Sequence, residues 1–208
     1  MVTASQLLPF LLAALLITIT PGPDNLMVLG LGMSKGRRLG MAFGLGCASG
    51  CLSHTVLAVI GVSAIVAASP TAFLLLKWAG GAYLIWLGVR AIRHAGAGTA
   101  AAADSREGTA RELFARGLVV NAINPKVVLF FLSFLPQFVD QARGHVEWQL
   151  GILGLVFTAQ AALVFGLLGY FAGTIGAWLN RTPRAAAWLD RVAGAVFVGL
   201  GARMILSR

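Results

Sequence analysis

The sequence predicts an all-α integral membrane protein, with six transmembrane helices arranged as two inverted three-helix repeats and with proline-broken helices in the first and fourth places. Of the 208 residues, 58% are hydrophobic and only 11% are charged, whereas soluble domains contain about 25% charged residues. The mean hydropathy of +0.85 is correspondingly high. The apolar runs are continuous, unlike the strands of about ten residues with alternating polarity that form membrane β-barrels. These features exclude a soluble domain and favour membrane-spanning helices.

Six apolar runs reach the length of roughly 20 residues that a bilayer-spanning helix needs. They cover Leu7–Gly32, Leu39–Ala67, Ala72–Val89, Leu113–Val139, Trp148–Leu179 and Ala185–Leu206. The sixth run is the weakest, because Asp190 and Arg191 interrupt it and must lie near a membrane interface. The N-terminal residues lack the positive region of a cleaved signal peptide, so we expect the first run to be a span of the mature protein.

The runs are expected to form one membrane domain, residues 1–208, divided by its one long polar segment. Residues 90–112 are basic and rich in Ala, Gly and Ser, and they separate a first repeat, residues 1–89, from a second, residues 113–208. Since three spans bring the chain to the opposite side, the second repeat enters the membrane inverted relative to the first. Secondary transporters with this architecture bind substrate between the repeats, near the middle of the membrane.

The formal net charge of +9 predicts an orientation in the lipid bilayer and not a nucleic-acid partner. The charged residues are too few, and too localised between the apolar runs, to form a phosphate-binding face. Eleven of the sixteen Lys and Arg residues lie in or beside three connectors on one side of the predicted bundle, namely Lys35, Arg37, Arg38, Arg90, Arg93, Arg106, Arg111, Arg116, Arg181, Arg184 and Arg191. Basic residues accumulate on the cytoplasmic side of membrane proteins, so we expect these connectors inside and both termini outside.

The first run is broken within its apolar stretch by Pro21, Gly22 and Pro23. Proline lacks a backbone N–H and disfavours helix in the residue before it, so carbonyls preceding the break lose their helical donors. Irregular backbone within a membrane is tolerated only where it is buried in protein or lines a wet cavity. Asp24 and Asn25 follow at once, and a carboxylate at the membrane centre costs about 2.5–3.5 kcal/mol. The break therefore predicts a polar functional site.

The fourth run has a matching break, in which Asn121 and Asn124 precede Pro125 and Lys126. A carboxylate and an ammonium that face one cavity are complementary to a zwitterion. In this interpretation Asp24 binds a substrate ammonium or titrates during the cycle, Lys126 binds the carboxylate, and the Asn amides serve the freed backbone or the substrate. The structural alternative is that Asp24 and Lys126 only neutralise each other between packed helices.

These motifs also carry a resemblance to a known family. The stretches TPGPDN at 20–25, KWAGGAYL at 77–84, FARG at 114–117 and NAINPK at 121–126 resemble the lysine exporter family, and more closely its homoserine/threonine-resistance branch. The resemblance covers essentially the whole chain and implies a six-helix amino-acid exporter of the bacterial inner membrane, driven by the proton gradient. It leaves the substrate open among zwitterions such as threonine, homoserine, leucine and lysine. The family's motif residues correspond to Pro21, Gly22, Pro23, Asp24, Asn25, Asn124, Pro125 and Lys126.

A second hypothesis rests on Cys47, Cys51 and His54, which lie at i, i+4 and i+7 on one face of the second run. Thiolate and imidazole bind soft metals, so a divalent heavy-metal efflux transporter is the alternative function. With Gly40 and Gly44, however, the two cysteines form a stripe of small residues that allows close helix packing. Because the spans offer no fourth ligand, we expect no metal site and no cofactor.

Three further polar residues lie within the runs. His54 is the only histidine in the spans and is a hypothetical proton carrier. Gln160 is expected either to line the cavity or to bond a neighbouring helix, and Lys77 is expected to extend to the outer interface. An enzyme is disfavoured, since the sequence holds no Ser/His/Asp array, HExxH or CxxC motif. A homodimer is compatible with the sequence.

Overall fold

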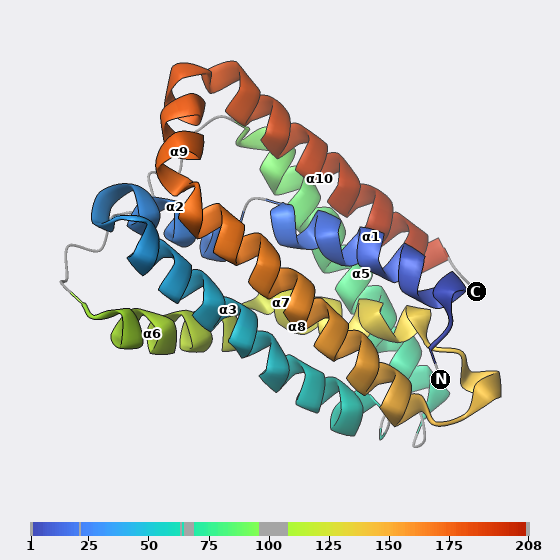
Figure 1. Cartoon of the computed structure of the whole chain (residues 1–208). Coiled ribbons are helices and arrows are strands. Elements are labelled where there is room, and N and C mark those ends of the chain that lie inside the picture. Colours follow the sequence, from blue (N-terminus) through green and yellow to red (C-terminus); the bar gives the residue numbers. More distant parts are fainter. Residues whose placement is uncertain (1, 21, 63, 65–68, 96–107, 207–208) are drawn as a thin grey trace.

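The computed structural model describes residues 2–20, 22–62, 64, 69–95 and 108–206, and every regular element within these ranges is helical. The long helices run roughly along one axis, and the start of the first helix and the end of the last helix lie toward the same end of the bundle (Figure 1). The described residues contain no strand, which confirms the all-α class.

The chain alternates long helices with short helical segments. In chain order the elements are α1 (Ala4–Ile19), α2 (Pro23–Lys35), α3 (Arg37–Leu57), the π-helical η1 (Ala58–Val62), α5 (Pro70–Arg93), α6 (Ala110–Ala122), α7 (Pro125–Leu129), the π-helical η2 (Phe130–Phe134), the 3₁₀ turns η3 (Leu135–Phe138) and η4 (Gln141–Arg143), α8 (Val146–Tyr170), α9 (Ala172–Arg181) and α10 (Pro183–Leu206). Local signals start several of them. At α6, for example, the side chains of Thr109 and Glu112 each accept the other's backbone N–H.

Three unbroken helices of the described chain are long and apolar enough to cross a membrane, namely Arg37–Gly61, Thr71–Arg93 and Val146–Tyr170. Two bent pairs also qualify if each counts as one span: α1 with α2, bent by 57°, and α6 with the segment Pro125–Phe138, bent by 51°. The total is therefore three to five candidate spans. The predicted sixth span corresponds to α10, which is 24 residues long but contains Arg184, Asp190, Arg191 and Arg203.

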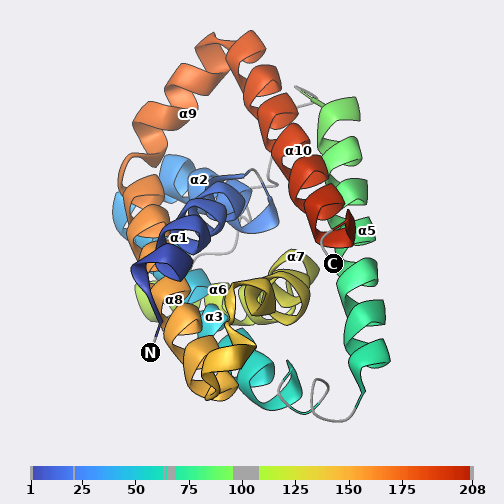
Figure 2. The ribbon, with the colours of Figure 1, turned by 90° about the vertical axis from the view of Figure 1, so that its right-hand side faces the viewer.

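The fifth span is shorter than the sequence predicts. The apolar run extends to Leu179, but α8 ends at Tyr170, and the chain bends at Phe171 before α9 begins. The physical reason is length, since 32 apolar residues exceed the roughly 20 that a bilayer accommodates. The remaining residues form α9, which carries the chain from the end of α8 to the start of α10 (Figure 2).

The helices pack in two groups. In the first, α3 packs against both α6 and α8, and α8 also contacts α1 and α2. In the second, α5 and α10 pack along each other beside the first group (Figure 2). Segment η2 links the groups, because Ser133 in η2 donates a hydrogen bond of 3.1 Å to the carbonyl of Leu76 in α5.

Glycines allow α3 and α6 to cross at backbone contact. A Cβ atom on Gly46 would collide with the carbonyl oxygen of Phe114, and a Cβ on Gly117 would collide with the carbonyl oxygen of Phe43. The predicted small-residue stripe also allows close packing near the start of α3, where Gly40 lies against the backbone of Gly32 in α2. These crossings bring the broken helices close to one another.

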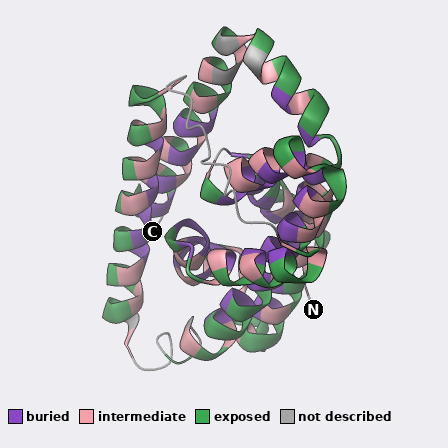
Figure 3. Ribbon diagram, turned by 90° about the vertical axis from the view of Figure 1, so that its left-hand side faces the viewer, coloured by how far each residue is buried: buried purple, intermediate pink, exposed green. Residues whose placement is uncertain are grey.

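The outer surface of the bundle is apolar. Large hydrophobic side chains such as Leu12, Val119, Leu155 and Leu163 are more than half exposed, and exposed positions follow the outward sides of the helices (Figure 3). A soluble protein would cover such faces with charged groups, whereas lipid tails solvate them. Together with the candidate spans, this surface supports a multi-pass membrane protein.

Both proline motifs interrupt helices as the sequence predicts. Helix α1 ends at Ile19, Gly22 is in an extended conformation, and Pro23 begins α2. Helix α6 ends at Ala122, and Pro125 begins α7. Proline suits the first position of a helix because the N–H it lacks would have no helical partner there. Pro21 lies outside the described residues.

Candidate functional site

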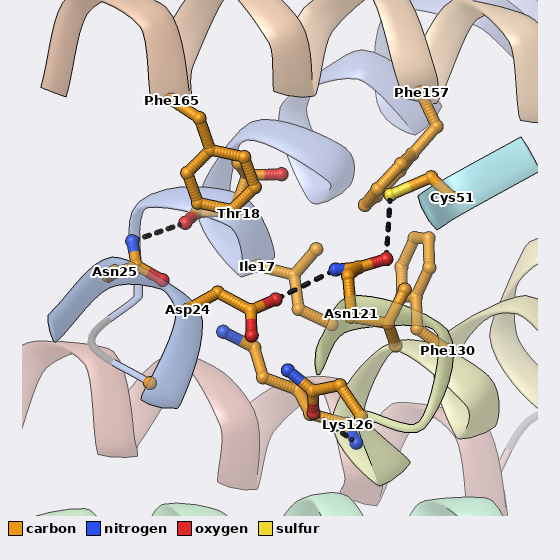
Figure 4. A pocket seen from close by; sticks show the side chains of 13 residues that line it. Ile17, Thr18, Asp24, Asn25, Cys51, Asn121, Lys126, Phe130, Phe157 and Phe165 are labelled. Atoms are coloured by element: carbon orange, nitrogen blue, oxygen red, sulfur yellow. Dashed lines mark hydrogen bonds between the residues drawn. The ribbon is translucent and has the colours of Figure 1, made fainter. Parts of the chain in front are cut away.

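A small cavity lies between the two helix breaks. Its volume is about 20 Å³, and a single water needs about 10–15 Å³ by the same measure. In this conformation the cavity therefore has room for about one water molecule. It is lined by Ile17, Thr18, Gly22, Asp24, Asn25, Cys51, Asn121, Asn124, Lys126, Val127, Phe130, Phe157 and Phe165 (Figure 4).

Asp24 contributes a buried carboxylate with one unpaired oxygen. The residue is 3% exposed, and its Oδ2 accepts a hydrogen bond of 2.7 Å from Nδ2 of Asn121 (Figure 4). The other oxygen, Oδ1, is buried and has no hydrogen-bond partner among the described residues. Asp24 also lies in the first turn of α2, where the helix dipole favours negative charge. The site thus offers a carboxylate oxygen, Oδ1 of Asp24, that can accept a further hydrogen bond.

Lys126 contributes a buried ammonium on the other side of the cavity. The residue is 9% exposed, and its Nζ donates a hydrogen bond of 3.0 Å to the carbonyl of Thr20, at the end of α1. The same Nζ lies 5.4 Å from the ring centroid of Phe197 in α10, within the range of a cation–π contact. A Cβ on Gly22 would lie 3.3 Å from this nitrogen, so the glycine leaves space for the ammonium.

The two charges form no ion pair with each other in the described part of the chain. Each bonds to a neutral group instead: Asp24 accepts a hydrogen bond from the Asn121 amide, and Lys126 donates one to the Thr20 carbonyl. Direct mutual neutralisation, the structural alternative from the sequence, is therefore not observed. The arrangement leaves one carboxylate and one ammonium facing a common cavity without contact.

Asn121 joins three elements. Its Nδ2 bonds to Asp24, its Oδ1 lies 3.5 Å from Sγ of Cys51, and its backbone carbonyl lies 3.0 Å from Nε2 of His54. The two partners on α3, Cys51 and His54, lie about one helical turn apart. Gly50 of the same helix leaves space for the Asn121 side chain, since a Cβ on Gly50 would lie 2.8 Å from Cβ of Asn121. Helix α3 therefore holds Asn121 in place beside Asp24.

The other two asparagines stabilise the helix breaks. Nδ2 of Asn25 donates a hydrogen bond of 2.8 Å to the carbonyl of Thr18, in the last turn of α1. Oδ1 of Asn124 accepts a hydrogen bond of 3.0 Å from the backbone N–H of Lys126 at the start of α7. Each amide thus satisfies backbone groups that proline leaves without helical partners.

Gln160 and His54 lie behind the cavity lining. Oε1 of Gln160 is 3.2 Å from the hydroxyl of Thr18, which lines the cavity, and its Nε2 is buried without a partner among the described residues. His54 contacts Asn121 through Nε2, while its Nδ1 is buried and also lacks a partner in that part of the chain. Neither side chain lines the cavity, but each touches one that does.

The sequence alone does not place several of the lining residues at the cavity. Thr18 and Cys51 line the cavity, as do the rings of Phe130, Phe157 and Phe165. The position of Thr18 within one turn of the proline break is a signal that could have identified it. The aromatic residues give no such signal, because phenylalanine is ordinary in a membrane-spanning helix and only the fold shows which way it points.

The alternative metal site finds no support in the geometry. Among the described residues, no three His, Cys, Asp or Glu side chains are placed to hold a metal ion. The Cys51 thiol and the His54 ring contact Asn121, and Cys47 is fully buried away from the cavity.

Comparison with known proteins identifies the family of the chain. The profile of the LysE type translocator family matches residues 15–208. A homoserine/homoserine lactone efflux protein of Salmonella typhimurium is 32% identical over 202 residues, 96% of this chain and 95% of that protein. An uncharacterized membrane protein of Vibrio cholerae is 34% identical over 93% of this chain and 93% of its own length. An uncharacterized membrane protein of Bacillus subtilis is 30% identical over 97% of this chain and 99% of its own length. No solved structure matches the chain. The chain belongs to the LysE type translocator family, and it is accordingly a membrane transporter and not an enzyme.

Proposed function

We propose that this protein exports a small zwitterionic amino acid from the cytoplasm across the bacterial inner membrane, in exchange for protons. The observation that carries the proposal is the pair of unmatched charges, since the free oxygen of Asp24 and the ammonium of Lys126 face the same cavity without contacting each other. The efflux protein that shares 32% identity over 96% of the chain supports the direction of transport and the class of substrate.

The two ends of an amino acid match these two charges in a substrate-bound conformation, in which the cavity must be wider than it is here, with room for about one water molecule. The substrate ammonium donates to Oδ1 of Asp24, which has no other donor in the described chain. The substrate carboxylate accepts from Nζ of Lys126. Within the described residues this nitrogen donates one hydrogen bond, to the Thr20 carbonyl, and an ammonium has three protons to donate. The amides of Asn25, Asn121 and Asn124 surround the same space and complete the polar wall.

The remaining walls favour a small neutral side chain. Asp24 and Lys126 are the only charged side chains among the described lining residues, so a lysine-like substrate would leave its second ammonium without a carboxylate. Ile17, Val127 and the phenylalanines offer apolar contact, and Thr18 adds a hydroxyl. Of the candidates threonine, homoserine, leucine and lysine, the first two fit this mixture best, in agreement with the homoserine efflux relative.

Competition for Asp24 provides the coupling to protons. The oxygen that accepts the substrate ammonium is also the atom that a proton would occupy, so Asp24 holds one or the other at a time. Release of substrate outside then allows a proton to take its place, which neutralises the buried carboxylate for the return step. Gln160 and His54 support this region, and the free Nδ1 of His54 makes it a secondary proton carrier.

We also propose the full six-span architecture in two inverted repeats, residues 1–89 and 113–208, joined by the loop 90–112. The packing supports it, because α3 pairs with α8 and α5 with α10, the second and third spans of each half. The connection between α2 and α3, the start of α6 and the connection between α9 and α10 lie toward one end of the bundle, away from both termini (Figure 1). The basic connectors therefore face the cytoplasm and the termini face outward. The homodimer stays a prediction, to be measured by the mass of the detergent-purified protein.

Transport by purified protein in liposomes tests the proposal. Vesicles are loaded with labelled homoserine or threonine, and efflux is measured with and without an imposed pH gradient. We expect wild-type protein to respond to the gradient and both Asp24→Asn and Lys126→Gln to slow efflux by roughly tenfold or more, since each removes a charged hydrogen bond. Glu147→Gln and Arg143→Gln, on exposed residues far from the cavity, are the matched controls and are expected to behave as wild type. Wild-type efflux in both site variants would refute the mechanism.

A further inference from the structure

Cys51 is a polar group on the cavity wall to which the proposed transport cycle assigns no task. It is 1% exposed and lies on α3, with its Sγ directed at the amide of Asn121 (Figure 4). The other cysteine, Cys47, is one turn earlier on the same helix and is 0% exposed, but it does not line the cavity. The two cysteines thus share a helix and a degree of burial, and only one reaches the site.

The thiol proton has two acceptors within reach. Sγ of Cys51 is 3.5 Å from Oδ1 of Asn121 and 3.7 Å from the backbone carbonyl of Cys47. Asn121 is 1% exposed, and no other donor to its Oδ1 occurs in the described chain. If the thiol bonded to the Cys47 carbonyl, Oδ1 would be a buried acceptor without a donor, which native proteins avoid. The shorter contact, to Asn121, is therefore the one that uses the proton.

That hydrogen bond and the Asp24 carboxylate together set the direction of the Asn121 amide. With Oδ1 toward the thiol, Nδ2 points at Asp24 and donates across 2.7 Å. A reversed amide would place its oxygen at that distance from Oδ2 of Asp24, and two acceptor oxygens repel each other. The donors and acceptors therefore run in one sense, from the Cys51 thiol through the Asn121 amide to the Asp24 carboxylate, as the dashed lines of Figure 4 show.

We infer that Cys51 is a positioning residue for the ammonium subsite. Its thiol keeps an N–H of Asn121 on one oxygen of Asp24, so that the other oxygen stays open for the substrate ammonium. The inference rests on the proposed function, because it assumes that Asp24 binds the ammonium. It gives a task to a side chain that the sequence singled out only as a metal ligand or a packing residue.

The location of Asn121 does not depend on the thiol. Nε2 of His54 contacts the backbone carbonyl of Asn121, and Gly50 receives its Cβ. Loss of the Cys51 donor therefore leaves Asn121 in place and removes one of the two hydrogen bonds that orient its amide. The defect expected from this is weaker substrate binding and not unfolding.

Efflux kinetics of cysteine variants test the inference. Cys51→Ala removes the donor, Cys51→Ser restores a donor of similar size, and Cys47→Ala controls for loss of a buried thiol on the same helix. We expect Cys51→Ala to raise the KM for homoserine about threefold to tenfold, as loss of one hydrogen bond would, with little change in the maximal rate. We expect KM in Cys51→Ser and Cys47→Ala to stay near wild type. A KM unchanged in Cys51→Ala, or raised equally in Cys47→Ala, would overturn the inference.

A double variant shows whether Cys51 acts through Asn121. In an Asn121→Ala background the thiol has no amide to orient, so Cys51→Ala is expected to change KM no further. Additive effects of the two changes would contradict the inference. Asp24→Asn distinguishes failure of this inference from failure of the proposed function. An unchanged KM in Asp24→Asn would refute the contact between Asp24 and the substrate. A raised KM in Asp24→Asn with an unchanged KM in Cys51→Ala would refute only the positioning role of Cys51.

Discussion

Asp24 and Lys126 are each buried against neutral hydrogen-bonding groups, and they form no ion pair with each other in the described chain. A carboxylate at the membrane centre costs about 2.5–3.5 kcal/mol on insertion scales, and a single amide from Asn121 meets that cost only in part. The fold keeps Lys126 on the Thr20 carbonyl instead of on Asp24. In the proposed cycle, the substrate is the partner that completes both charges.

Asn25 allows a prediction at the scale of one residue. Its amide donates to the Thr18 carbonyl, which lies beside the break, so Asn25→Ala leaves a buried acceptor without its donor. We expect a loss of about 1–3 kcal/mol of stability, measured as a lower melting temperature in detergent. Thr158→Ala is the control. The Thr158 hydroxyl donates a hydrogen bond to the carbonyl of Gly154, but this carbonyl lies within the regular turns of α8. Equal melting temperatures of wild type and Asn25→Ala would contradict this role.

Sequence reasoning finds residues whose chemistry is out of place and misses those whose orientation matters. Asp24, Asn25 and Lys126 stand out because polar groups follow proline inside apolar runs. Cys51 lines the cavity through the rotation of α3, which the sequence does not specify. For Lys77 the prediction is wrong: the side chain is expected at the interface but is 6% exposed, because α10 and η2 pack on α5.

At the scale of elements, the crossing of α3 and α6 determines how Asn121 meets Asp24. The small-residue stripe predicts close packing of α3 but not its partner, and the fold shows reciprocal contacts at Gly46 and Gly117. Small residues alone do not establish a crossing. Gly169 of α8 meets the backbone of Met41, whereas Gly173 of α9 has nothing within 4 Å of its missing Cβ.

Gly46→Ala tests this crossing. The added Cβ would collide with the Phe114 carbonyl, a backbone atom that cannot rotate away, so the helices must separate. We expect a loss of about 1–3 kcal/mol of stability together with slower efflux, measured by melting temperature and the liposome assay. Gly166→Ala on α8, where nothing lies within 4 Å, is the control and should match wild type. Indistinguishable behaviour of the two variants would argue against the crossing.

For the whole molecule, hydropathy predicts the helical class, and the positions of the breaks correspond to the two bent helix pairs. Length and composition alone do not determine the number of spans. Five meet the criteria of length and apolarity when each bent pair counts as one, and α10 carries four charged residues. Its packing along α5 argues for a sixth crossing, and this contact follows from the tertiary fold and not from local sequence.

Reporter fusions test that sixth crossing and the orientation together. Alkaline phosphatase is active only outside the cytoplasm, so we expect activity when it is fused after Arg208 and none when it is fused after Arg93. A cytoplasmic fluorescent protein at the same two sites should give the opposite pattern. Phosphatase inactive at the C-terminus would mean that α10 does not cross or that the bundle is inverted.

The small volume of the cavity has a consequence for the energy supply of the cell. A continuous file of water molecules through a membrane protein would let protons pass without any cargo. With room for about one water beside Asp24, the cavity between the helix breaks has no space for such a file in this conformation. In the proposed proton-coupled cycle, an idle carrier in this state would therefore not let protons pass through this cavity without cargo.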